Sequence, residues 1–155
     1  MGNEMKELLK RIGIFFGSMM LVFAFLFGGN LLVRNTWRQE LSENIGTVFD
    51  AAFSGQWRIG EYVPLSTPMS VSSAVFRVYS GSSGESGGYA AVIRVTGVSG
   101  PVAAVYQVTG DGEVRYIGVA GVSDPLKHPR WFGLTDSVIS VWGGRIGKLL
   151  EGAVL

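Results

Sequence analysis

The chain has 155 residues, which is the length of one ordinary domain and excludes a large multidomain protein. Glycine accounts for 23 residues, and charged residues for only 16%, against about 25% in an average soluble domain. The mean hydropathy of +0.31 is high for a soluble protein, and the formal net charge is +1. Because the chain has no cysteine, thiol catalysis and iron–sulfur clusters are excluded.

The first element is an uncharged apolar run over residues 12–33, bounded by Lys10 and Arg11 before it and Arg34 after it. As a helix rising 1.5 Å per residue, this run can cross the roughly 30 Å of a bilayer core. A cleaved signal peptide has a shorter apolar region of about 7–15 residues, and no small-x-small cleavage site precedes Arg34. The sequence therefore predicts a transmembrane helix that follows a short N-terminal segment, residues 1–11.

The basic residues that flank this run predict its orientation. Lys6, Lys10 and Arg11 precede it, whereas Arg34 and Arg38 follow it, so the positive-inside rule places the N-terminus inside. We therefore expect a single-pass protein of the cytoplasmic membrane, in contact with the lipid bilayer, whose C-terminal domain is extracytoplasmic. Residues 35–155 carry 9 basic and 10 acidic residues, which gives no indication of a nucleic-acid partner.

A second helix is expected directly after the membrane, in a stalk over residues 34–56. Asn35 can cap its first free N–H groups. Apolar residues then recur at steps of three and four, which is typical of a helix with one buried face: Trp37, Leu41, Ile45, Val48, Phe49 and Ala52.

The remainder, residues 57–155, is predicted to form one extracytoplasmic domain of the α+β class. Short runs rich in Val, Ile, Tyr and Phe predict strands at residues 57–63, 74–80, 89–95, 102–108 and 113–122. Turns are expected at 99–101 and 110–112, and an exposed low-complexity loop at 80–88. These strands form an antiparallel sheet. After Pro129 we expect a loop and then a terminal helix from Arg145, with Ile146, Leu149 and Leu150 on one face, packed on the sheet.

Few residues offer chemistry. His128 is the single histidine and is expected to be an exposed loop residue. The acidic residues are scattered over turns and form no pair, so we predict no catalytic residue and no metal site. A glycine-rich stretch at 143–147 is typical of a phosphate cradle that opens a helix, because free backbone N–H groups attract an anion. Trp142, beside it, could wall a planar ring.

The order of strands and turns over residues 89–129 is more specific than their composition. A strand leads to Gly100-Pro101, a second strand leads to Asp111-Gly112, and a third leads to a loop that ends at Pro129. This order resembles the FMN-binding domain of the Rnf complex G subunit and of its relative, the C subunit of the Na⁺-translocating NADH:quinone oxidoreductase. Members of that family also carry an N-terminal transmembrane helix and place the domain outside the cytoplasmic membrane.

The resemblance implies an FMN cofactor. In the family, a Ser-Gly-Ala-Thr segment ahead of the last helix supplies the threonine whose hydroxyl is esterified to the flavin phosphate. Ser140 aligns with the serine of that segment and Gly143 with its threonine, so an attachment here would use Ser140 or Thr135. The other implied cofactor-binding residues are Trp142 at the flavin ring and Gly143, Gly144 and Arg145 at the phosphate.

Three functions follow as hypotheses. The first is an FMN-carrying subunit of an ion-translocating electron-transport complex, which passes electrons between membrane partners. The second is a cofactor-free structural or assembly subunit of such a complex, and the third is an unrelated membrane-anchored binding module, since a fold alone does not fix a function. In the first two, the partners are other integral membrane subunits.

Overall fold

The structure is a computed structural model that describes residues 2–65 and 72–151, without the side chains of residues 2–4, 30–35, 149 and 151. The chain divides into two structural units, Met1–Gln39 and Glu40–Leu155. The side chain of Leu149, which we expected on an apolar helix face, lies outside the described residues.

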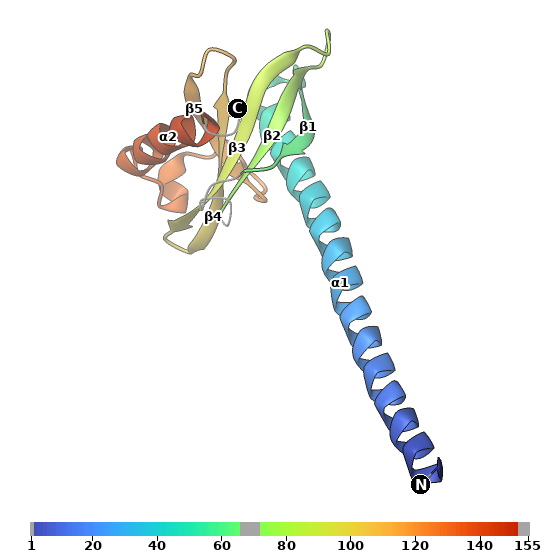
Figure 1. Ribbon diagram of the computed structural model, residues 1–155. Coiled ribbons are helices and arrows are strands. Elements are labelled where there is room, and N and C mark those ends of the chain that lie inside the picture. Colours follow the sequence, from blue (N-terminus) through green and yellow to red (C-terminus); the bar gives the residue numbers. More distant parts are fainter. Residues whose placement is uncertain (1, 66–71, 152–155) are drawn as a thin grey trace. The chain divides into compact units, whose positions relative to one another are not determined.

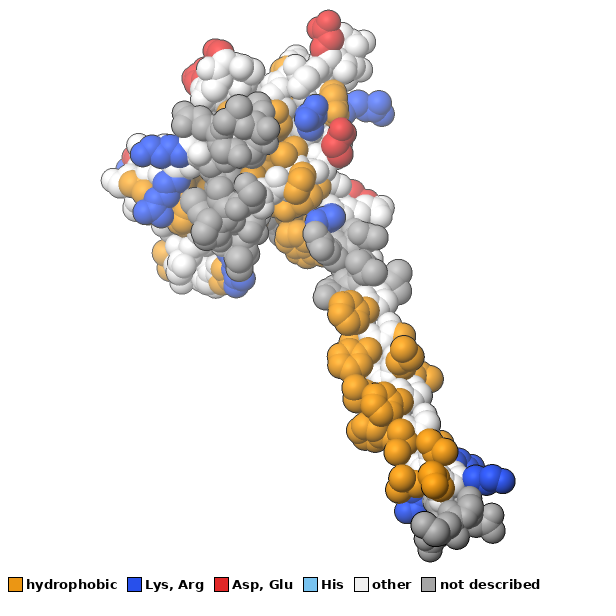
Figure 2. All heavy atoms as spheres, viewed as in Figure 1, with side chains coloured by type: hydrophobic (Ala, Val, Ile, Leu, Met, Phe, Trp, Pro, Cys, Tyr) orange, Lys and Arg blue, Asp and Glu red, His pale blue; other side chains and the backbone are white. Residues whose placement is uncertain are grey.

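Helix α1 (Gly2–Phe53) contains the apolar run that we expect to span a membrane. One stretch of it, Met5–Gly29, is long and apolar enough to cross a membrane, with a mean hydropathy of 2.1 and no buried residue. Figure 2 shows apolar side chains along the visible side of this stretch, with basic side chains near its N-terminal end. Apolar side chains that the protein itself leaves uncovered are what a lipid-facing helix requires.

The helix does not restart at Asn35. Our expectation of a separate stalk helix capped by that residue is wrong, because α1 continues without a break from Gly2 to Phe53. The uncharged run passes directly into good helix-forming sequence, and neither a proline nor a turn lies between them to stop the hydrogen-bond ladder. The helix ends at the turn formed by Ser54 and Gly55, which both have positive φ angles.

A five-stranded antiparallel sheet follows, in the simple order β1-β2-β3-β4-β5 (Figure 1). Its strands are β1 (Trp57–Val63), β2 (Ser73–Ser80), β3 (Ser86–Gly97), β4 (Gly100–Val108) and β5 (Val114–Ala120). The 3₁₀ turn η2 (Pro129–Phe132) and helix α2 (Asp136–Glu151) complete the chain. The predicted α+β class is confirmed.

The turns between strands are short. Gly97 pairs with Gly100, so a two-residue turn joins β3 to β4, and Gly100 takes the φ of +125° that this turn needs. The β2–β3 connection is shorter than the loop expected at residues 80–88, because β3 already begins at Ser86. There Gly88, at a φ of +112°, lies so close to the Val108 carbonyl that a side chain would collide with it.

One face of the sheet is covered by the end of α1. Ile45, Val48 and Phe49 are almost completely buried in a cluster with apolar side chains of β2, β3, β4 and β5. The predicted apolar face of this helix segment is therefore confirmed, except at Trp37, which is 52% exposed.

The opposite face is covered by α2. Ile146 and Leu150 are buried there against Ile93, Tyr106 and Val119 of the sheet. Figure 1 shows α2 lying across the β5 side of the sheet. The sheet is thus the middle layer of three, with a helix on each face.

We expect the substitution Phe49→Ala to lower the free energy of unfolding of the Glu40–Leu155 unit by about 3–5 kcal/mol, because it empties a fully buried ring site. The measurement is denaturant unfolding of the full chain in detergent, followed by tryptophan fluorescence. The neighbouring exposed residue gives the control, since Asp50→Ala should change stability by at most about 0.5 kcal/mol. Equal midpoints for the two variants would show that α1 is not part of this core.

Candidate functional site

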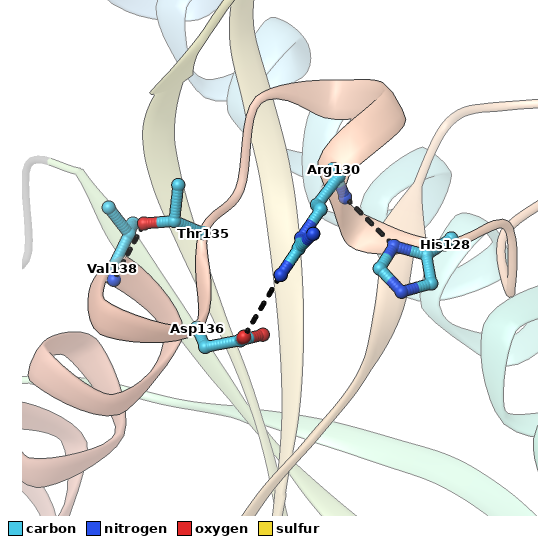
Figure 3. A network of polar contacts seen from close by, with 5 residues as sticks. All are labelled: His128, Arg130, Thr135, Asp136 and Val138. Carbon is cyan, nitrogen blue, oxygen red and sulfur yellow. Dashed lines mark hydrogen bonds and ion pairs between the residues drawn. The ribbon is translucent and has the colours of Figure 1, made fainter.

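The predicted cofactor-binding residues lie on or just before α2, but the helix begins earlier than expected. It starts at Asp136, so the stretch at 143–147 is in its interior and our expectation that these glycines open a helix is wrong. Thr135 caps the helix: its hydroxyl accepts from the Val138 N–H at 3.3 Å, and its carbonyl accepts from the Ile139 N–H at 3.0 Å (Figure 3).

The glycines of α2 face the sheet and solvent instead of a ligand. A Cβ added to Gly143 or Gly147 would lie 3.9 or 4.0 Å from the side chain of Val114 in β5, whereas one on Gly144 would meet nothing within 4 Å. Their backbone N–H groups lie inside a regular helix, where each donates to the carbonyl four residues earlier. The glycine-rich stretch therefore offers no free donors for a phosphate.

The remaining predicted residues are divided between two environments. Trp142 packs partly buried against the core, and the Arg145 guanidinium lies 4.9 Å from the centre of its ring, in cation–π contact. Ser140 is exposed on the helix, as is Thr135 at its start. The structure brings Trp142 and Arg145 together, but it does not bring them together with the two hydroxyls.

These observations test whether the residues fit an FMN phosphate. The free N–H groups of α2 are those of its first turn, where the Thr135 hydroxyl already serves as an acceptor and the Asp136 carboxylate adds negative charge. A phosphate placed there would be repelled by Asp136, whose own partner is Arg130 at 3.6 Å. The α2 region thus does not fit the expected flavin phosphate.

His128 is exposed, as expected, in the loop before η2. Its Nδ1 accepts from the Arg130 backbone N–H at 3.4 Å, which caps η2 (Figure 3). Within residues 2–65 and 72–151, no group of three or more His, Cys, Asp or Glu residues is close enough to hold a metal ion.

Sequence reasoning missed a pocket of about 390 Å³ beside the C-terminal half of α2. It is lined by Ser86, Gly88, Tyr89, Val108, Thr109, Gly110, Gly112, Gly147 and Leu150. Its volume is within the range of small-molecule sites, about 300–1,000 Å³. The sequence feature that could have indicated this pocket is the set of glycines at or near strand ends, among them Gly88, Gly110 and Gly112. At its rim, the Thr109 hydroxyl donates to the Asp111 carboxylate and holds the pKa of that carboxyl below its ordinary value.

Two tyrosines lie side by side under α2. The rings of Tyr106 and Tyr116 meet edge to face, 5.5 Å apart, and the Tyr106 hydroxyl donates to the Ile139 carbonyl at 3.4 Å. Burial raises the pKa of each to about 12, and the mutual repulsion of the pair adds to the shift of Tyr106. Both therefore stay neutral near pH 7 and support packing.

We expect Gly144→Ala to raise the free energy of unfolding by about 0.5–1 kcal/mol, because alanine favours the helix and its Cβ meets nothing. Thermal unfolding of the full chain in detergent measures this. In contrast, Gly118→Ala should destabilise the domain, since its Cβ would collide with the Pro125 carbonyl. A lower unfolding temperature for Gly144→Ala would show that this glycine is needed for more than a helical backbone.

Comparison with known proteins adds one result. No curated protein and no solved structure matches the chain significantly. A family model described as "Uncharacterised protein" matches residues 47–154, which include the last turns of α1, all five strands, η2 and α2. The match covers more than half of the sequence, and the chain belongs to that family.

Proposed function

We propose that the protein is a single-pass, accessory subunit of a membrane electron-transport complex, which acts as a docking module and carries no covalent flavin. One observation carries the proposal. Helix α1 holds a span with uncovered apolar side chains, Met5–Gly29, and it also supplies Ile45, Val48 and Phe49 to the core of the folded domain.

A retained anchor accounts for this shared helix better than a cleaved leader does. A leader is removed at a recognisable site after a short apolar region. Here the helix runs on past Arg34 without a break and ends only at Phe53, within the domain. The membrane span and the domain core are thus parts of one element, as a permanent anchor requires.

The accessory role is supported by what the α2 region offers. Thr135, the hydroxyl that precedes the helix, is used as a cap, and the glycines are used for helix–sheet packing. The electron-transport context comes from the resemblance of residues 89–129 to the flavin-subunit family. A subunit of this kind would bind its partners, other integral membrane subunits, through its surface.

The orientation is proposed to be N-terminus inside. In a chain without cysteine, Ser82→Cys in the β2–β3 turn gives one thiol for labelling. A maleimide that cannot cross membranes should label this variant in intact spheroplasts, because the turn is exposed and extracytoplasmic. The matched variant Asn3→Cys, in the N-terminal segment before the span, should react only after the membrane is opened. The opposite pattern would reverse the orientation.

The protein purified in mild detergent should have the intact mass of the bare chain, 16.6 kDa, and should elute together with other integral membrane proteins. Mass spectrometry and size-exclusion chromatography measure the two properties. A heavier, fluorescent chain that returns to the bare mass in Ser140→Ala would support the flavin-carrying subunit instead. Elution of the chain alone would contradict the accessory role.

A further inference from the structure

Exposed apolar side chains gather at one end of the sheet. In the described part of the Glu40–Leu155 unit, four large apolar side chains are exposed, and three of them come from the β3–β4 turn and the segment after β5: Val98 at 82%, Trp131 at 71% and Leu126 at 45%. The fourth, Val141, lies on α2. Large exposed apolar groups that gather in one place mark an interaction surface.

The backbone holds these two segments together. The Val98 N–H donates to the Phe132 carbonyl at 3.3 Å, which ties the β3–β4 turn to η2. The Val119 N–H donates to the Pro125 carbonyl at 3.0 Å, which ties the segment after β5 back to that strand. Gly133 lies so close to Val98 that a side chain on it would collide. The surface is therefore preformed.

Basic groups accompany the apolar ones. The Lys127 ammonium lies 4.2 Å from the centre of the Trp131 ring, and Arg130 lies at the start of η2, where it pairs with Asp136 at 3.6 Å (Figure 3). The segment between β5 and η2 contains one acidic residue, Asp124. We call Val98, Leu126, Lys127, Arg130 and Trp131 the loop patch.

The loop patch lies at the end of the sheet at which the α1 segment of the Glu40–Leu155 unit begins. A Cβ on Gly118 of β5 would meet both the Val48 side chain of α1 and the Pro125 carbonyl of the segment after β5, so this part of the helix lies beside that segment. Helix α1 ends at the opposite end of the sheet, where the Gly81 N–H donates to the Gln56 carbonyl. Within the Glu40–Leu155 unit, the helix therefore starts on the patch side, and the membrane span precedes it in the sequence.

We infer that the loop patch docks on the surface of the bilayer that holds α1, an inference that rests on the anchor proposed above. Tryptophan and basic residues side by side are typical of the membrane–water interface, where the ring lies among headgroups and the ammonium meets lipid phosphate. Trp37, exposed on α1 between the span and Glu40, has the same character. The anchor makes docking intramolecular, so a small patch suffices.

Lipid quenching tests the inference on the full chain. Because the sequence has no cysteine, Ser99→Cys places one fluorescent label in the β3–β4 turn, beside Val98. The protein is reconstituted alone into vesicles of phosphatidylcholine and phosphatidylglycerol with brominated acyl chains. We expect a loss of fluorescence at this label. Ser83→Cys, in the exposed turn at the other end of the sheet, should keep its fluorescence.

A label at Leu21→Cys, in the span, separates the two proposals, because it is quenched whenever the chain is inserted. Quenching at Leu21 but not at Ser99 would overturn membrane docking and leave the anchor intact. Quenching at neither label would overturn both proposals.

The chemistry of the patch is tested by two further changes in the Ser99→Cys chain. Trp131→Ser together with Lys127→Glu should restore most of the fluorescence in anionic vesicles, because it removes the ring and reverses the charge. Both side chains are exposed, so the fold should persist, as an unchanged unfolding temperature would verify. Arg115→Glu, an exposed charge reversal elsewhere on β5, is the matched control and should leave quenching unchanged. Equal quenching in all three chains would exclude the patch as the contact.

Discussion

The structure depends on a sheet whose two faces are both apolar and must both be covered. In β3, four consecutive residues, Ala90–Ile93, are buried, so side chains that point to opposite faces are equally withdrawn from water. An antiparallel sheet usually leaves one face to solvent and alternates polar with apolar residues. Here α2 can cover only one face. The end of α1 must supply the second cover, which makes the last turns of this long helix part of the domain.

This double cover explains part of the glycine content. At Gly118 of β5 the Pro125 carbonyl and the Val48 side chain of α1 both occupy the space that a Cβ would need, so no side chain would fit. At Gly97 an added Cβ would collide with the Phe132 carbonyl. Each such site lets a loop or helix approach the sheet backbone directly. The same contacts hold the segment after β5 in place, so packing of the core also positions the exposed loop patch.

Most of the fold could be predicted from the sequence because its signals are local. Alternation and β-branched residues located all five strands, and β1 has the expected bounds. The start of α2 could not be read this way, because Ile139 and Val141 favour strands and Gly143 and Gly144 weaken a helix. Packing of Ile146 and Leu150 on the sheet outweighs those preferences. Thr135, whose hydroxyl can cap a helix, is the local signal that does indicate the start of α2.

The proposed docking surface was less accessible to sequence reasoning, since it depends on which segments meet. Ser140 and Trp142 are only two residues apart in sequence, yet on a helix side chains at that spacing point to nearly opposite sides. A motif interpreted as a loop site therefore does not keep its side chains together. Conversely, Val98 and Trp131 are far apart in sequence and share a surface only because the β3–β4 turn is bonded to η2. Isolated exposed apolar residues need no explanation, but a group of them placed by backbone contacts beside basic side chains does. For a chain that we propose to be anchored in the membrane, the bilayer is the partner that is always within reach.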